Sequence, residues 1–74
     1  NKKQGMCTAW YEDGSLMFVE EYDKDRLIQG KYLRPGEHTP ISRVAEGSGI
    51  ATLFDADGKF IRKICYEDGE PVER

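Results

Sequence analysis

The chain of 74 residues contains little of what builds reactive sites, with one histidine and two cysteines. A transmembrane helix needs about 20 consecutive apolar residues, and every apolar run in this chain is far shorter. The sequence therefore predicts no such helix. His38 accompanies no nucleophile or acid–base motif, and we predict no catalytic residue. Cys7 and Cys65 lie near opposite ends of the chain and outside any C-x-x-C spacing, which favours two reduced thiols in a cytoplasmic protein. A disulfide would require the first and last strands to meet.

The chain also lacks an excess of positive charge. It has 11 Lys and Arg against 14 Asp and Glu, a net charge of −3, and the two signs are interspersed. A nucleic-acid module normally shows a basic stripe that neutralises phosphates, and attachment to an anionic membrane needs clustered Lys and Arg. We therefore predict no nucleic-acid partner and no membrane partner. The acidic balance suits a basic protein partner, because opposite fields raise association rates.

Metal and cofactor motifs are missing as well. The stretch Asp55-Ala56-Asp57-Gly58 begins like a calcium loop, but the further oxygen ligands, the bidentate Glu and the flanking helices of an EF-hand are absent. Gly47-Ser48-Gly49 is a glycine loop with no helix after it to bind a phosphate. Both stretches are typical of turns, so we predict no metal and no cofactor.

What the chain does contain is one pattern that occurs twice, 44 residues apart. Its fixed positions are two glycines, an aromatic residue and a tyrosine: Gly5, Trp10, Gly14 and Tyr22, then Gly49, Phe54, Gly58 and Tyr66. A fixed period indicates a repeat architecture in which each supersecondary unit stacks on its neighbour. The Asp-Gly dipeptide in each copy is a strong signal for a β-hairpin turn.

Alternation of apolar and polar residues between these turns predicts β-strands throughout. The expected strands cover residues 6–11, 16–22, 27–33, 41–46, 50–54 and 59–66, with Val72 as the stub of another. Strands separated by such short turns pair with their neighbours. We therefore predict an all-β fold, an antiparallel meander of about six short strands built from β-hairpin repeats in a single curved layer.

The spacing also predicts how the repeats divide the chain. Residues 1–74 form one repeat domain with units at about 5–29, 30–48 and 49–72, and the central unit is degenerate because Pro35-Gly36 replaces its Asp-Gly turn. The period is then about 22 residues. Because the chain begins with Asn1 rather than methionine, we expect it to be part of a longer protein.

The repeated unit, Gly-x-x-x-x-[Trp/Phe]-x-x-Asp-Gly-x-[Leu/Phe] followed by a tyrosine, resembles a MORN repeat. The stretches that match best are residues 10–16 and 65–69, and the pattern is closest to bacterial MORN-variant arrays. Similar arrays occur in the YwqK-like proteins, described as antitoxin components of toxin–antitoxin modules. The likeness covers residues 5–30 and 49–72 well and residues 31–48 poorly. It implies a curved single-layer sheet with repeated aromatics across one face.

Two sets of side chains follow from these patterns. We expect the four repeated aromatic residues to stack between neighbouring hairpins as the small core of the sheet. Five residues outside that register are the candidate interaction face: Tyr11, Met17, Val19, Leu53 and Ile61. Exposed apolar patches of this kind mark interaction sites, and aromatic and methionine side chains dominate interface energies.

These expectations favour a non-catalytic protein–protein interaction module. Its partner would be another protein or a second copy of the chain, and self-association through the apolar face or through an open edge strand would give a homodimer. The resemblance to the YwqK-like proteins implies neutralisation of a toxin as another form of the same role. The alternative from a different class is an accessory domain of a larger enzyme whose catalytic part lies elsewhere in the parent chain.

Overall fold

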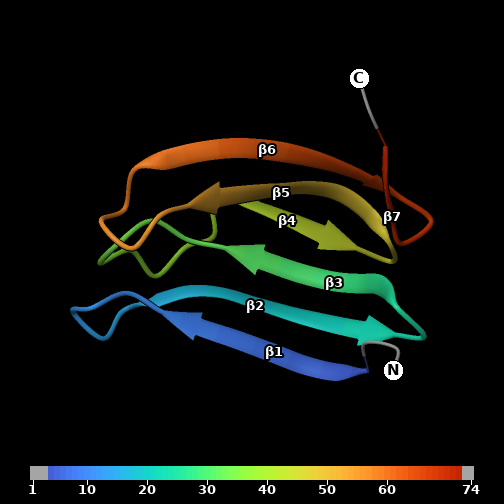
Figure 1. Cartoon of the computed structure of the whole chain (residues 1–74), viewed down its shortest axis with the longest axis horizontal. Helices are drawn as coiled ribbons and strands as arrows, with labels where there is room; N and C mark the ends of the chain where they lie inside the picture. Colours follow the sequence, from blue (N-terminus) through green and yellow to red (C-terminus); the bar gives the residue numbers. More distant parts are fainter. Residues whose placement is uncertain (1–3, 73–74) are drawn as a thin grey trace.

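The computed structural model describes residues 4–72, and all of its regular structure is β-sheet (Figure 1). The strands are β1 (Gly5–Trp10), β2 (Leu16–Asp23), β3 (Arg26–Tyr32), β4 (Ser42–Ala45), β5 (Ser48–Phe54), β6 (Phe60–Glu67) and β7 (Glu70–Val72). They form one antiparallel sheet in the order β1 to β7, and the sheet is not closed. The predicted all-β meander is confirmed, with a seventh strand where the sequence indicated only the stub at Val72.

The first and third hairpins repeat the same pairing. Gly5 lies opposite Tyr22 in the β1–β2 pair, and Gly49 lies opposite Tyr66 in the β5–β6 pair. Both hairpins also contain a β-bulge at the same repeat position, next to Trp10 in one and next to Phe54 in the other. The identical offset in sequence therefore produces an identical register, including its irregularity.

Three two-residue turns show that the repeat has a period of 22 residues. Their first residues are Lys24, Glu46 and Asp68, with φ values of 51°, 53° and 53°, and the residue that follows each also has positive φ. Positive φ at both positions is the geometry of a type I′ turn, which matches the twist of antiparallel strands. By this spacing, Gly5, Leu27 and Gly49 occupy equivalent positions in successive units.

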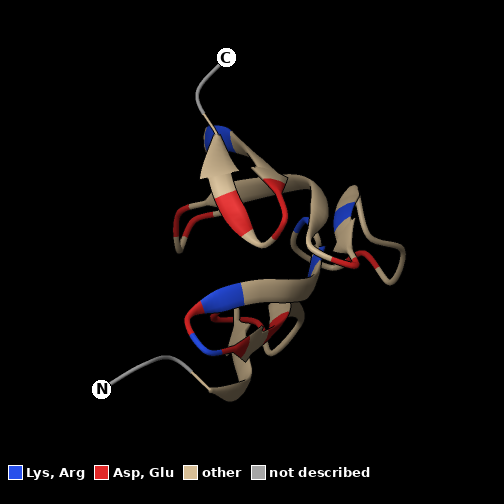
Figure 2. Cartoon of the chain, turned by 90° about the vertical axis from the view of Figure 1, so that its right-hand side faces the viewer, with Lys and Arg blue, Asp and Glu red and all other residues tan. Residues whose placement is uncertain are grey.

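The core lies on the inner, concave face of the sheet, which curves into a C shape (Figure 2). Its buried centre and the half-buried side chains around it are Leu27, Tyr32, Val44 and Ala51, with Phe18, Tyr22, Ile64 and Tyr66. Tyr32 and Leu27 are both 0% exposed. Five positions apart on one strand, they would normally face opposite sides, but the bulge that inserts Ile28 brings both to the inner face.

The expected aromatic core is thus partly wrong. Tyr22 and Tyr66 do pack against the buried cluster, but Trp10 is 62% exposed and Phe54 is only half-buried. By the alternation of β1, Trp10 shares the outer face with Met6 and Thr8. The indole of Trp10 stays in solvent because β1 is the edge of the sheet and no further strand lies beside it in the described residues 4–72.

One carboxylate holds tyrosines of two strands together on the inner face. Tyr32 donates a hydrogen bond of 2.6 Å to Glu20 Oε2, and Tyr22 donates one of 3.1 Å to Glu20 Oε1. Burial raises the pKa of both hydroxyls, and the nearby Glu20 charge raises it further. The pKa of Tyr66 on β6 is raised by the same two causes. The Glu20 carboxylate therefore raises the pKa of tyrosine hydroxyls on β2, β3 and β6.

We expect the fold to be lost in alkaline solution as a consequence. All four tyrosines, with Tyr11 as the fourth, have a folded-state pKa above the ordinary value of 10.0. A raised pKa means that the folded state holds the proton more tightly, so the stability is fully present below pH 10 and falls above it. For the buried Tyr32 alone the loss is about 1.4 kcal/mol for each pH unit.

The measurement is a pH series followed by tyrosinate absorbance and by circular dichroism in the same samples. Tyrosinate should form together with the loss of the β-sheet signal, at pH values above 10. Tyrosinate that formed near pH 10 in a protein with an unchanged circular dichroism spectrum would contradict this prediction.

Candidate functional site

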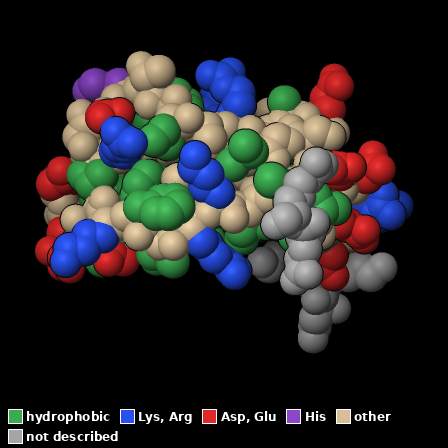
Figure 3. All heavy atoms as spheres, turned by 90° about the horizontal axis from the view of Figure 1, so that it is seen from above, with side chains coloured by type: hydrophobic (Ala, Val, Ile, Leu, Met, Phe, Trp, Pro, Cys, Tyr) green, Lys and Arg blue, Asp and Glu red, His purple; other side chains and the backbone are tan. Residues whose placement is uncertain are grey.

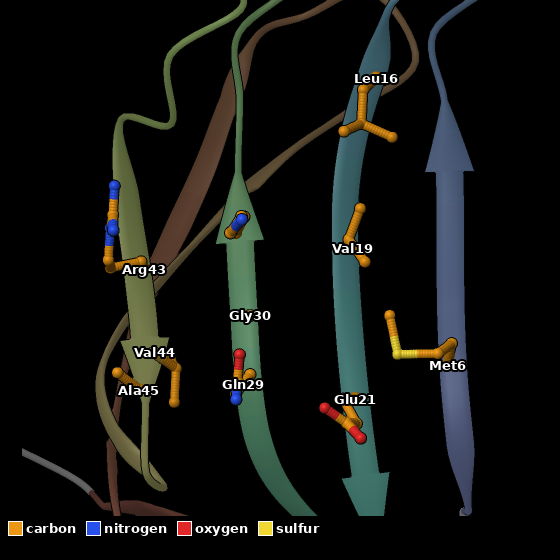
Figure 4. Close-up of a pocket in the computed structure, with 10 residues that line it drawn as sticks. Met6, Leu16, Val19, Glu21, Gln29, Gly30, Arg43, Val44 and Ala45 are labelled. Atoms are coloured by element: carbon orange, nitrogen blue, oxygen red, sulfur yellow. The ribbon is translucent and has the colours of Figure 1, made fainter.

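The outer face of the first four strands carries a groove of about 300 Å³ (Figure 4). Its lining comes from β1, β2, β3 and β4: Met6, Leu16, Val19, Glu21, Gln29, Gly30, Lys31, Arg43, Val44 and Ala45. The register explains why these side chains meet. Met6 is opposite Glu21, Val19 is opposite Lys31, and Lys31 is opposite Arg43, so that they alternate away from the core.

The groove has an apolar part and a charged part. Met6, Leu16 and Val19 line it from β1 and β2, and Figure 4 shows the side chain of Met6 extending from β1 toward β2, which carries Leu16 and Val19. Lys31 and Arg43 line it from β3 and β4 with two positive charges, and Glu21 on β2 adds one negative charge, so the charged part of the lining is net positive. Such a site suits an extended peptide that combines apolar side chains with a carboxylate, because both kinds of contact are then available within one groove.

The edge strand β1 borders this groove and has no neighbour on its outer side within residues 4–72. Its six residues, Gly5–Trp10, contain no charged residue and no proline. Met6 and Trp10 on this strand are 63% and 62% exposed. Edge strands are normally protected against pairing by charge, by proline or by shortness. β7 has all three protections, since it is three residues long and contains Glu70 and Pro71, whereas β1 has none of them.

The five residues of the predicted interaction face do not form one patch. Tyr11 is only 5% exposed, and its hydroxyl donates a 2.7 Å hydrogen bond to the carbonyl oxygen of Leu33, so the prediction that it lies on an exposed face is wrong. Leu53 is half-buried and pairs with Arg62 in a register that turns it toward the inner face. The loop after β3 covers Tyr11, and that long-range contact cannot be read from alternation.

The remaining three predicted residues lie on two separate strands. Val19 lines the groove on β2, and Met17 is half-buried on the same strand, where its carbonyl oxygen accepts a hydrogen bond from the Leu33 amide. Ile61 is 55% exposed on β6, which three strands separate from β2. The sequence analysis missed Met6, although alternation already placed it on the face opposite the core. Pairing it with Val19 would have required the register of β1 against β2.

The other residues considered in the sequence analysis as possible metal, catalytic or disulfide residues do not line the groove. Oδ1 of Asp55 accepts hydrogen bonds of 2.9 Å from the amides of Asp57 and Lys59, so this carboxylate closes its own turn. His38 is exposed in the loop between β3 and β4. Cys7 and Cys65 are free thiols. Among the residues that the structure describes, no group of His, Cys, Asp and Glu is arranged to hold a metal ion.

Comparison with known proteins assigns no family to the chain. A scan against protein-family models, a search of curated proteins and a search of solved structures each found no match. The part of the chain that the structure describes contains no helix that is long and apolar enough to cross a membrane.

Proposed function

We propose that this chain is a non-catalytic protein–protein interaction module that binds an extended segment of its partner along β1. The observation that carries this proposal is the unprotected edge of β1, with two large exposed side chains, Met6 and Trp10, next to an apolar groove. Main-chain hydrogen bonds to such an edge supply affinity, and a neighbouring groove for alternate side chains supplies specificity. The likeness of the repeat to MORN arrays, which serve as scaffolds and dimerisation surfaces, agrees with this role.

The groove contributes a second element of recognition. A strand added to β1 would run beside Met6, and side chains from its outer face could reach the apolar wall formed by Met6 and Val19. Lys31 and Arg43 lie farther across the same face and favour an acidic group on the bound segment. The proposed ligand is therefore an extended segment with apolar residues at alternate positions.

Selection of short random peptides displayed on phage against the folded chain tests this proposal. We expect the selected peptides to bind the native chain and to lose about thirtyfold in affinity, or roughly 2 kcal/mol, when Val19→Glu places a charge in the apolar wall. Ile50→Glu is the matched control, because Ile50 is 40% exposed on β5 and does not line the groove. Fluorescence anisotropy gives the affinities. A failure to select any peptide, or an equal loss in both variants, would overturn the proposal.

A further inference from the structure

The outer edge of β6 is only partly covered. β7 pairs with β6 at Cys65, Tyr66 and Glu67, and the strand residues from Phe60 to Ile64 have no partner on that side within residues 4–72. Seen from above β6, hydrophobic side chains alternate with Lys and Arg over this part of the molecule (Figure 3). Arg62 and Lys63 are both exposed there. Within residues 4–72 the sheet therefore has a second, incompletely paired edge, at the opposite end from β1.

The repeat itself shows which kind of strand pairs at such an edge. In the 22-residue period, β1, β3 and β5 are the first strands of their units, and β3 and β5 each pair with the second strand of the unit before. β7 occupies the corresponding place on β6, with Pro71 and Val72 equivalent to Gly5 and Met6. β1 of a second copy is thus a longer strand of the type that this edge already binds.

We propose that the chain assembles head to tail, with β1 of one copy replacing β7 on the outer edge of β6 in the next copy. This inference rests on the proposed use of β1 as a docking strand and names a second copy as its partner. Continuing the β6–β7 register places Lys63 opposite Thr8 of the second copy and Ile61 opposite Trp10 of the second copy. Trp10 and Ile61, which are 62% and 55% exposed, then cover each other.

Charge favours this arrangement over a twofold pairing of two β1 strands. Residues 4–23, which contain the first hairpin, include five acidic and no basic residues. Two such hairpins brought edge to edge would repel each other. In the head-to-tail arrangement the acidic hairpin instead meets the strand that carries Arg62 and Lys63. The six residues of β1 also offer more backbone pairing than the three of β7 that they displace.

Site-directed cross-linking tests the arrangement. Cys7→Ser with Cys65→Ser provides a thiol-free chain, to which Thr8→Cys is added in one preparation and Lys63→Cys in another. Both positions are exposed, so neither change disturbs the core. A short bis-maleimide should give a cross-linked dimer in the mixture of the two preparations and none in either preparation alone. A mixture in which Lys31→Cys on β3, a strand paired on both sides, replaces Lys63→Cys is the control, and it should give none.

Two results would overturn the head-to-tail arrangement. Cross-linking of the Thr8→Cys preparation by itself would show that two β1 strands pair, and a mixture without cross-linked dimer at any chain concentration would show that β6 does not bind β1. Neither result affects the peptide selection described above, because that experiment uses a different ligand. A failed cross-link with successful peptide binding would therefore remove only the second copy as the partner.

Discussion

Replacing Tyr32 by alanine is expected to remove most of the free energy of unfolding of this chain. Tyr32 is 0% exposed and forms the centre of the buried cluster with Leu27, Val44 and Ala51. Loss of a buried aromatic ring costs about 3–5 kcal/mol through lost burial and the cavity left behind. A domain of this size has a total stability on the order of 5 kcal/mol, so a single change of this size removes most of it.

Tyr32→Phe is the matched control for this prediction. It keeps the ring and removes only the hydroxyl that donates to Glu20, so the expected loss is about 1–2 kcal/mol. Urea unfolding followed by circular dichroism measures both variants. If Tyr32→Ala unfolded with a loss of stability no larger than that of Tyr32→Phe, the ring would not be the centre of the core.

The second large effect is expected for Gly49→Ala, a substitution by one methyl group. Gly49 has a φ of 144° at the point where β4 turns into β5 and pairs with Val44. An added Cβ would lie 2.9 Å from the Cα of Val44 and closer still to the carbonyl oxygen of Arg43. Both neighbours are backbone atoms in a paired strand and cannot move aside cheaply. We expect a loss of about 3 kcal/mol from the clash and the strained backbone together.

Gly14→Ala separates the two causes. Gly14 also has a positive φ, 88°, but an added Cβ there meets no atom within 4 Å. The expected loss is therefore about 1 kcal/mol, which is the cost of the left-handed conformation alone. The same urea experiment measures both variants. Equal losses at the two glycines would show that the close approach of Arg43 and Val44 does not constrain the sheet.

Much of the fold follows from local chemistry. Asp13-Gly14 and Asp57-Gly58 form hairpin turns because glycine takes the positive φ that each turn requires, with values of 88° and 83°. The segments between the turns have the length of strands, and strands joined by such short turns pair with their neighbours, which predicts their order in the sheet. The equal offset of the two copies then gives equal registers, with Gly5 opposite Tyr22 and Gly49 opposite Tyr66.

The residues of the groove could be predicted from the sequence only in part. Val19 was predicted to be available for binding, and it lines the groove, but its neighbours Met6 and Lys31 come from other strands. Tyr11 is buried, and its hydroxyl donates a hydrogen bond to the carbonyl oxygen of Leu33, which lies 22 positions away. Alternation gives the two faces of one strand, whereas a groove across four strands depends on how each strand is shifted against the next.

The sequence by itself determined the meander, its hairpin turns and its period, because each depends on residues that are close along the chain. Only the tertiary structure decided which aromatic ring is buried. The one extra residue at Ile28 turns Tyr32 to the inner face, while Trp10 at the equivalent position lies on the outer face of an edge strand and remains 62% exposed. Side chains alternate with a period of two, so one inserted residue exchanges the faces of every position beyond it.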